Sequence, residues 1–171
     1  NDTSQIIPVC IGAGASSGRK KTSGYENPTV IECINLNGFV EKYLEKTGRP
    51  ETNCEDFLIS HDAWNHYCSC PPHEFYSYFT ELKQWADCPQ AKVTVMDKKG
   101  RQYLLGTDTS EKEQTINPIE LYAYYIGMHL NNMKNGIYMN YLLSYPVECS
   151  KESRQLITDS FEKGIKKSLP S

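Results

Sequence analysis

The sequence lacks the features of a membrane-spanning or nucleic-acid-binding chain. None of its apolar runs reaches the roughly 18 residues that a membrane-spanning helix needs, and its first residues lack the charged-then-apolar pattern of a signal peptide. Lys and Arg number 18 against 21 Asp and Glu, so the formal net charge is −3 and no evenly basic surface is indicated. We therefore expect a cytoplasmic protein with no membrane and no nucleic-acid partner.

Motifs for phosphate binding and nucleophilic catalysis are also missing. The glycines of residues 12–18 form neither a Gly-Lys-Ser/Thr loop nor a G-x-G-x-x-G turn. His61, Asp62 and His66 offer a base and its orienting group, but no nucleophile sits in a G-x-S-x-G elbow. We interpret these three residues as structural and expect no catalytic residue in this chain.

The cysteines permit a metal site but do not favour it by their spacing. Seven cysteines cannot all pair within one chain, and we expect the thiols to be reduced. Cys68, Cys70, His73 and Cys88 are of the right types for tetrahedral zinc. However, a single C-x-C clip is followed by Cys88 only at the far end of a predicted helix, which spans roughly 20 Å. A zinc module is therefore a less favoured alternative.

Length and composition indicate one domain. The chain has 171 residues, of which 39% are apolar and 23% charged, values that are ordinary for a globular protein. No internal repeat or long linker divides it. The chain starts without Met and stops just beyond a predicted helix, so we expect residues 1–171 to be a piece of a larger protein.

Periodicity in the first two thirds of the chain predicts alternating strands and helices. Residues 28–34 read as a strand and residues 37–46 as a short helix. Residues 74–86 carry an aromatic stripe at helical spacing, which predicts a helix with a buried aromatic face. Residues 92–105 predict a β-hairpin around Lys98-Lys99-Gly100.

The stretch from residue 117 to residue 169 carries the strongest signals. Asn117 and Pro118 are typical of a helix start, and Asn135-Gly136 supplies a stop. The side chains of residues 137–147 are nearly all apolar, which predicts a strand that is buried between parallel neighbours and ends at Pro146. Ser150 is expected to cap a last helix whose buried stripe contains Leu156, Ile157, Phe161 and Ile165. The fold class is thus α/β, with helices packed on a mixed sheet.

Several segments resemble the nucleotide-binding domain of the 70-kilodalton heat-shock chaperones. Residues 141–157 look like the family's apolar strand that ends in a Pro, with an Arg-Gln pair on the helix that follows. Pro146 and Arg154 keep the eight-residue spacing of that pair. The whole chain looks still more like a divergent bacterial branch of these actin-like ATPases, through residues 26–32, 79–85 and 117–125.

The resemblance implies a fragment of the first lobe of an actin-like (ribonuclease H-like) ATP-binding domain. In that family ATP and magnesium bind between two lobes, and the Pro and Arg matched by Pro146 and Arg154 couple nucleotide state to the adjoining client domain. The family's phosphate loops and adenosine motif are absent here, and the match to its catalytic-Lys segment, residues 60–65, has no Lys. We therefore expect no ATP hydrolysis by this chain alone.

One alternative belongs to a different class of function. The chain contains twelve Tyr, five Phe and two Trp, and such aromatic side chains dominate protein contacts. The alternative to the ATP-binding fragment is therefore a free-standing protein-interaction domain.

Overall fold

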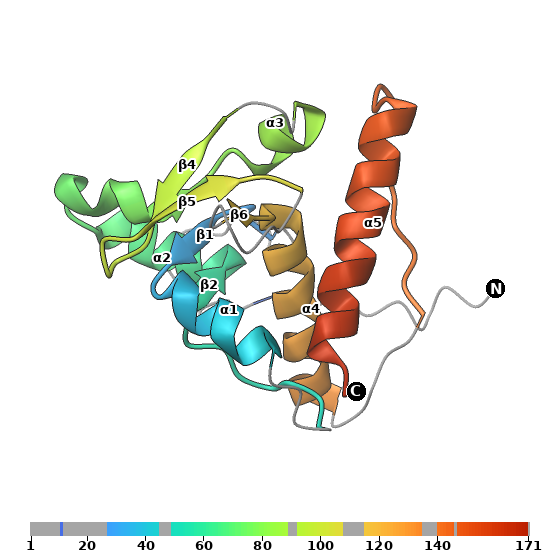
Figure 1. Cartoon of the computed structure of the whole chain (residues 1–171), viewed down its shortest axis with the longest axis horizontal. Coiled ribbons are helices and arrows are strands. Elements are labelled where there is room, and N and C mark those ends of the chain that lie inside the picture. The colour runs from blue at the N-terminus through green and yellow to red at the C-terminus, as the bar shows by residue number, and fades with distance from the viewer. Residues whose placement is uncertain are drawn as a thin grey trace.

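The fold is mixed α/β, with two small sheets and packed helices (Figure 1). The computed structural model describes residue 11 and residues 27–44, 49–88, 92–107, 115–134, 140–145 and 147–170. Its elements are β1 (Ile31–Cys33), α1 (Leu36–Leu44), β2 (Phe57–Ile59), α2 (Ser60–Ser69), the 3-10 helix η3 (Pro72–Ser77), β3 (Tyr78–Phe79), α3 (Leu82–Asp87), β4 (Thr94–Met96), β5 (Gln102–Leu105), β6 (Thr115–Ile116), α4 (Pro118–Lys134) and α5 (Lys151–Ser168). No helix within these ranges is both long and apolar enough to cross a membrane.

The strands form two three-stranded sheets rather than the single sheet we expected. In the first sheet β1 lies between β2 and β3 and is antiparallel to both, with Ile31 opposite Ile59 on one side and Phe79 on the other. In the second, β4 and β5 form the predicted hairpin and β6 adds in parallel to β5. The second sheet is therefore mixed, as the fold class predicts.

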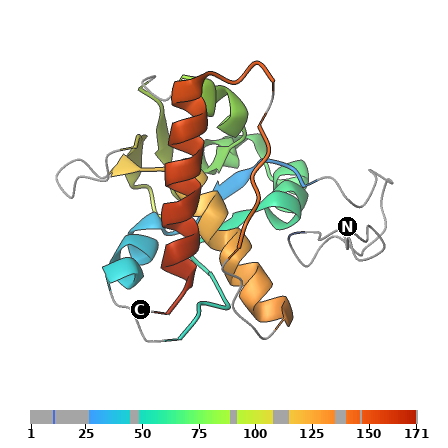
Figure 2. The same cartoon turned by 90° about the vertical axis from the view of Figure 1, so that its right-hand side faces the viewer.

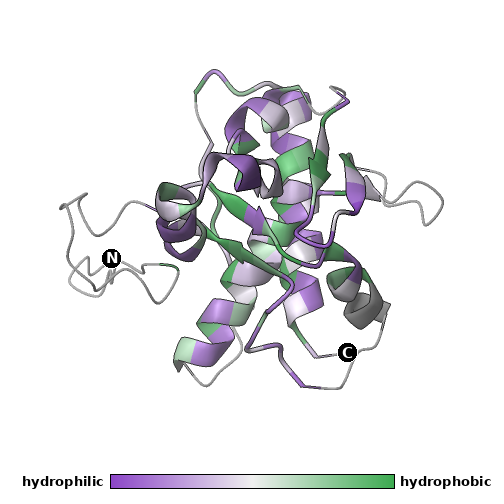
Figure 3. Ribbon diagram, turned by 90° about the vertical axis from the view of Figure 1, so that its left-hand side faces the viewer, coloured by the Kyte–Doolittle hydropathy of each residue, from purple (hydrophilic) through white to green (hydrophobic). Residues whose placement is uncertain are grey.

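The core lies between the strands, α1 and α4. The side chains of Leu36, Phe57 and Ile59 are 0% exposed. The ring of Phe39 packs edge-on against Phe57 at 5.2 Å and against Tyr124 at 5.1 Å. Burial of each such side chain contributes about 1.5–3 kcal/mol relative to leaving it in water. Figure 3 shows the apolar strands gathered at the centre, with polar residues on the outer turns.

Helices α4 and α5 pack side by side, with α5 on the outer side (Figures 1 and 2). Asn117 caps α4 as predicted, because its Oδ1 accepts hydrogen bonds from the amides of Ile119 and Glu120. Ser150 caps α5, since its Oγ accepts the Ser153 amide. The Glu120 carboxylate contacts Lys167 on α5.

Small residues allow the two helices to approach closely. A Cβ atom on Gly164 would lie 2.4 Å from the Glu120 carbonyl oxygen and 2.7 Å from Cβ of Ala123. The fully buried positions of α5 are therefore mainly Ser and Gly, and the predicted stripe is only half-buried at Leu156, Ile157 and Phe161. At the other end of α4, Met133 is 50% exposed.

Asn131 joins the ends of α4 and α5 to the loop that contains Glu51. Its Nδ2 donates to the carbonyls of Glu51 and Ser168, and the Glu51 amide donates to the same Ser168 carbonyl at 3.0 Å. These hydrogen bonds connect residues 80 and 37 positions apart in the sequence. The N-terminal half is thereby fixed to the C-terminal helix pair.

The β4–β5 turn is held by a buried carboxylate that sequence reasoning did not identify. Asp97 is 0% exposed, and it accepts hydrogen bonds from the amides of Leu36, Lys99 and Arg101. Gly100 in this turn has φ +79°, a conformation that glycine adopts without strain. One side chain therefore fixes both the hairpin turn and the start of α1.

The predicted helix over residues 74–86 is wrong in its middle. The chain forms η3, then the two residues of β3, then the short α3. Phe79, Leu82 and Trp85 are buried as expected, but Phe75 is 43% exposed. The aromatic spacing matched a helix by accident, because pairing of Tyr78 with Glu32 in the sheet outweighs local helix propensity.

The predicted buried strand over residues 137–147 is also wrong where the structure describes it. Residues 140–145 belong to no helix or strand, and Leu142 is 100% exposed. Composition predicted strand conformation, but no neighbouring strand in the described part of the chain lies beside it, so no ladder forms. Pro146 and the glycine loop of residues 12–18 lie outside the described residues.

Candidate functional site

A cluster of polar side chains in mutual contact is built around Glu32 on the central strand β1. This side chain is 1% exposed, yet its carboxylate has three partners. His66 Nδ1 lies 2.7 Å from Oε2, while Lys98 Nζ and the Tyr78 hydroxyl lie 2.5 Å and 3.1 Å from Oε1. A buried carboxylate is stable only when it is paired in this way.

Four elements bring these side chains together. Glu32 leaves β1 on the face opposite to the core residues Ile31 and Cys33, as alternation along a strand requires. Tyr78 pairs with Glu32 in the sheet register, His66 comes from α2, and Lys98 comes from the turn between β4 and β5. The cluster thus ties both sheets to α2.

The buried carboxylate of Glu32 shifts the pKa values of the side chains beside it. The hydrogen bond to Glu32 raises the pKa of Lys98, so this side chain is charged at neutral pH. Burial and the adjacent Glu32 charge raise the pKa of Tyr78, which keeps its hydroxyl protonated. The Lys98 ammonium also lies 5.9 Å from the centre of the Tyr78 ring, within the range of a cation–π contact.

The arrangement orients an imidazole towards solvent. An ionised carboxylate only accepts hydrogen bonds, so His66 donates to it through Nδ1. The rest of the His66 side chain reaches the surface, since this side chain is 57% exposed. The His66–Glu32 pair resembles the base and the orienting carboxylate of a catalytic triad, but we assign no nucleophile to it.

A ladder of aromatic rings borders this cluster. Trp64 stacks on Tyr67 with ring centres 5.7 Å apart, and Tyr67 contacts Phe75 at 5.1 Å and Tyr78 at 5.3 Å. Trp64, Phe75 and Tyr76 are 42%, 43% and 44% exposed. This surface is where the alternative of a protein-interaction domain would act, and that alternative stays a prediction.

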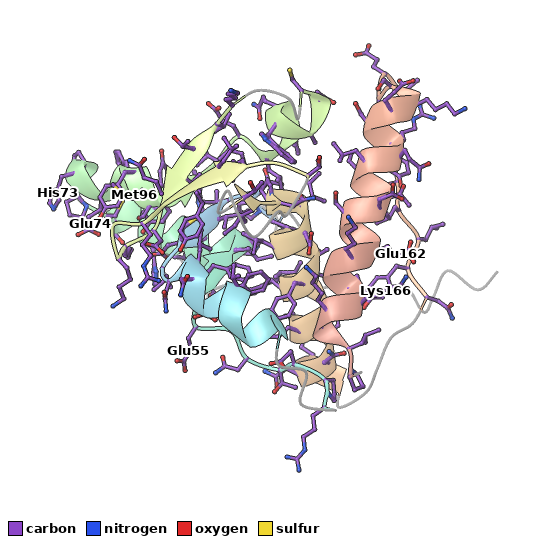
Figure 4. The ribbon with its side chains drawn as sticks, in the orientation of Figure 1. Glu55, His73, Glu74, Met96, Glu162 and Lys166 are labelled. Carbon is purple, nitrogen blue, oxygen red and sulfur yellow. The ribbon has the colours of Figure 1, made fainter. Side chains whose placement is uncertain are left out.

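The residues named as zinc ligands do not form a metal site in the described part of the chain. Cys68 lies on α2, Cys70 just after it, His73 in η3 and Cys88 just after α3. His73 is at the opposite end of β4 from α3 (Figures 1 and 4). Among the described residues, no group of three or more His, Cys, Asp or Glu side chains is placed to hold a metal ion.

Arg154 makes hydrogen bonds to residues nearby in the sequence, whereas Pro146 lies outside the described residues. The guanidinium of Arg154 donates from Nε to the Cys149 carbonyl at 3.0 Å and from NH2 to the Val147 carbonyl at 3.2 Å. It therefore ties α5 to the residue that follows Pro146. The coupling role of Pro146 and Arg154 stays a prediction.

The segment matched to the family's catalytic-Lys region forms a strand-to-helix junction. Ile59 ends β2, and Ser60 begins α2 with φ +57°, the left-handed conformation that glycine adopts most readily. Ser60 is 0% exposed, so its hydroxyl is no accessible nucleophile. No Lys follows within this segment; Trp64 and Asn65 stand there.

Glu120 and Lys167 form a second buried charged pair, between α4 and α5. Glu120 is 5% exposed, and burial raises its pKa to about 7. Burial also lowers the pKa of Lys167 to about 8. Contact between the two side chains favours their charged forms, but burial is the larger effect for each.

Sequence reasoning missed Glu32 although a signal was present. It is the one charged residue among the apolar residues 30–34, a position where a charge must find partners if the strand is buried. Its partners Lys98 and Tyr78 follow only from the sheet pairing, which sequence periodicity does not give. Comparison with family models, with curated proteins and with solved structures found no match to this chain.

Proposed function

We propose that this chain is part of the first lobe of an actin-like, chaperone-type ATP-binding domain and does not hydrolyse ATP alone. ATP and magnesium would bind to the whole domain, with groups that this chain lacks completing the site. Its partners would be the remainder of that domain and an adjoining client or interaction domain.

One observation carries the proposal: the segments that resemble the family fold around one core. Residues 27–32 lead into and include most of β1, and residues 79–85 span part of β3 and most of α3. Residues 117–125 begin α4, and residues 150–157 cap and begin α5. β1 pairs with β3, and α3, α4 and α5 contact one another. Four separate resemblances thus become neighbours in space.

The β2–α2 junction gives further support. In the family, a Gly-Asp-Ala-type segment precedes the catalytic Lys, and the matching segment here turns from strand into helix through a residue with positive φ. Phosphoryl transfer depends on positioned charge, and this junction has no Lys. The proposal therefore rests on a strand-to-helix turn at the segment that resembles the family's, together with the absence of the family's Lys.

The test is a titration of the ¹⁵N-labelled chain with ATP and Mg²⁺, followed by amide chemical shifts. We expect no binding tighter than about 1 mM, which is roughly −4 kcal/mol. Shifts at higher concentration should concentrate at residues 57–63, and AMP should produce much weaker ones.

Two results would overturn the proposal. Binding tighter than about 10 μM, or measurable ATP turnover, would mean that the chain carries a complete nucleotide site. Shifts confined to a surface far from the β2–α2 junction, or no shifts at about 20 mM ATP, would remove the relation to an ATP-binding lobe.

A further inference from the structure

Residues 140–145 follow a strand-like pattern of exposure without belonging to a sheet. Tyr141, Leu143 and Tyr145 are half-buried, whereas Asn140, Leu142 and Ser144 face solvent. This alternation has the period of two that a β-strand shows. The exposed side includes Leu142, whose side chain is 100% exposed.

The segment is fastened to α5 along its length. The ring of Tyr141 lies edge-on to Phe161 at 5.8 Å, and the Tyr145 hydroxyl is 2.6 Å from Oγ1 of Thr158. Beyond residue 145, Arg154 holds the carbonyl of Val147. Figure 1 shows the segment on the side of α5 away from the sheets, and Figure 2 shows it running alongside this helix. The segment is therefore held along the outer side of α5.

The backbone of this segment has free hydrogen-bonding groups. Within the part of the chain that the structure describes, the amides and carbonyls of Leu142–Tyr145 have no hydrogen-bond partner. Unpaired edges of this kind are templates for another strand, and proteins usually protect them with charged side chains or Pro. No charged residue occurs between Asn140 and Tyr145.

We propose that residues 140–144 pair with the same segment of a second copy of this chain as an antiparallel two-stranded ribbon centred on Leu142. In this register Leu142 lies opposite Leu142, Tyr141 opposite Leu143, and Asn140 opposite Ser144. Each cross-strand pair is compatible: apolar residues meet apolar or aromatic ones, and the two polar side chains meet each other.

The geometry closes as a two-fold symmetric pair. Residues directly opposite each other in an antiparallel pair lie on the same face of the ribbon. Tyr141 and Leu143 of both copies therefore face the two α5 helices, and Leu142 of both copies lies on the symmetry axis. A second copy fits because the segment carries no charge to repel itself and pairs like with like. A ribbon of this size is a small interface, so we expect a Kd of roughly 10–100 μM.

The first experiment measures mass against concentration by analytical ultracentrifugation from about 5 to 500 μM, a range that brackets the expected Kd. The wild-type chain should pass from monomer to dimer. Leu142→Lys should weaken the dimer at least tenfold, because two ammonium groups would meet on the axis. Met133→Lys is the matched control: it adds the same charge at a 50% exposed apolar position on α4 and should leave the dimer unchanged.

The second experiment tests the register. Opposed residues in an antiparallel pair have Cα atoms about 4.5–5.5 Å apart, within the range of a disulfide. L142C should therefore form an intermolecular disulfide under mild oxidation, which peptide mapping would assign to position 142 in both copies. M133C should not. Circular dichroism should be unchanged in all variants, since a fully exposed side chain supports no packing.

Three outcomes would overturn the inference. They are a monomer at every concentration, a dimer that M133K dissociates and L142K does not, and an L142C chain that cross-links through other cysteines only. None depends on ATP binding, so this inference and the proposed lobe can fail independently.

Discussion

Oε2 of Glu32 and Nδ1 of His66 lie 2.7 Å apart, although the two residues are 34 positions apart in the sequence. Their contact joins β1 to α2, and Lys98 adds the second sheet to the same carboxylate. This one side chain is thus a junction between three parts of the fold, which makes it a sensitive point for stability.

Glu32→Ala should lower the free energy of unfolding by about 2–4 kcal/mol, because it leaves a buried void and removes the acceptor of three polar groups. Urea denaturation would measure the loss. Glu162→Ala is the control: its ion pair with Lys166 is on the surface, with side chains 57% and 67% exposed, and should not change the midpoint detectably. Equal effects of the two substitutions would contradict the central role of Glu32.

Asp97→Ala should destabilise the chain by about 2–4 kcal/mol, since three backbone amides would lose their acceptor in a buried site. Asp97→Asn should cost less, because the amide oxygen still accepts. Hydrogen exchange of the amides of Leu36, Lys99 and Arg101 would show the loss directly. Asp87→Ala, at an exposed position on α3, is the control, and similar exchange in both Ala variants would refute the assignment.

Gly164→Ala should destabilise the α4–α5 pair by about 1–3 kcal/mol, although Ala is the better helix former by about 1 kcal/mol. The reason is steric: the new methyl group would overlap the Glu120 carbonyl. Thermal unfolding would measure this loss of stability, with Lys151→Ala at an exposed α5 position as the control. A stabilised Gly164→Ala variant would mean that the helices do not approach so closely.

We expect the ionisation of Glu120 to lower the stability of the folded chain between mildly acidic and neutral pH. Its pKa rises from 4.5 in the unfolded chain to about 7 in the folded one, so the folded state binds the proton more tightly. Its contribution is complete below pH 4.5 and is lost as the pH rises through 7.

Urea midpoints from pH 5 to 8 would test this effect. Glu120→Gln, which cannot ionise, should remove most of the fall, whereas Glu152→Gln at an exposed α5 position should keep it. A fall that persists unchanged in Glu120→Gln would assign it to another group.

Thiol labelling should separate the cysteines by burial. Cys33 is 2% exposed and burial raises its pKa to about 12, so it should react only on unfolding. Cys68 and Cys88 are exposed and should react first. A disulfide-exchange reagent followed by peptide mapping would give the order, and fast labelling of Cys33 in the native chain would contradict its place in the core.

Local signals predicted the helix ends well because those signals are short-range. Asn117 and Ser150 cap α4 and α5 through amides two or three residues away, and the Lys98–Gly100 turn closes its own hairpin. The α/β class follows from these elements.

Pairing between residues far apart in the sequence determines the parts of the fold that local sequence patterns do not predict. Residues 74–86 become partly strand because Tyr78 pairs with Glu32, 46 positions earlier, and residues 140–145 belong to no sheet in the described part of the chain. The Glu32 cluster depends on the same pairing. Among the candidate zinc ligands, Cys68 lies on α2 and Cys88 just after α3, so the fold sets them on different elements.

The hydrogen bonds around Asn131 have a consequence for how the chain folds during synthesis. Glu51 leaves the ribosome first, yet both groups that hold its backbone arrive later, Asn131 with α4 and Ser168 with the last turn of α5. The nascent chain must therefore carry α4 with its α5-facing side uncovered until translation passes residue 168. The backbone hydrogen bonds of Glu51 can therefore form only after α5 has been synthesised.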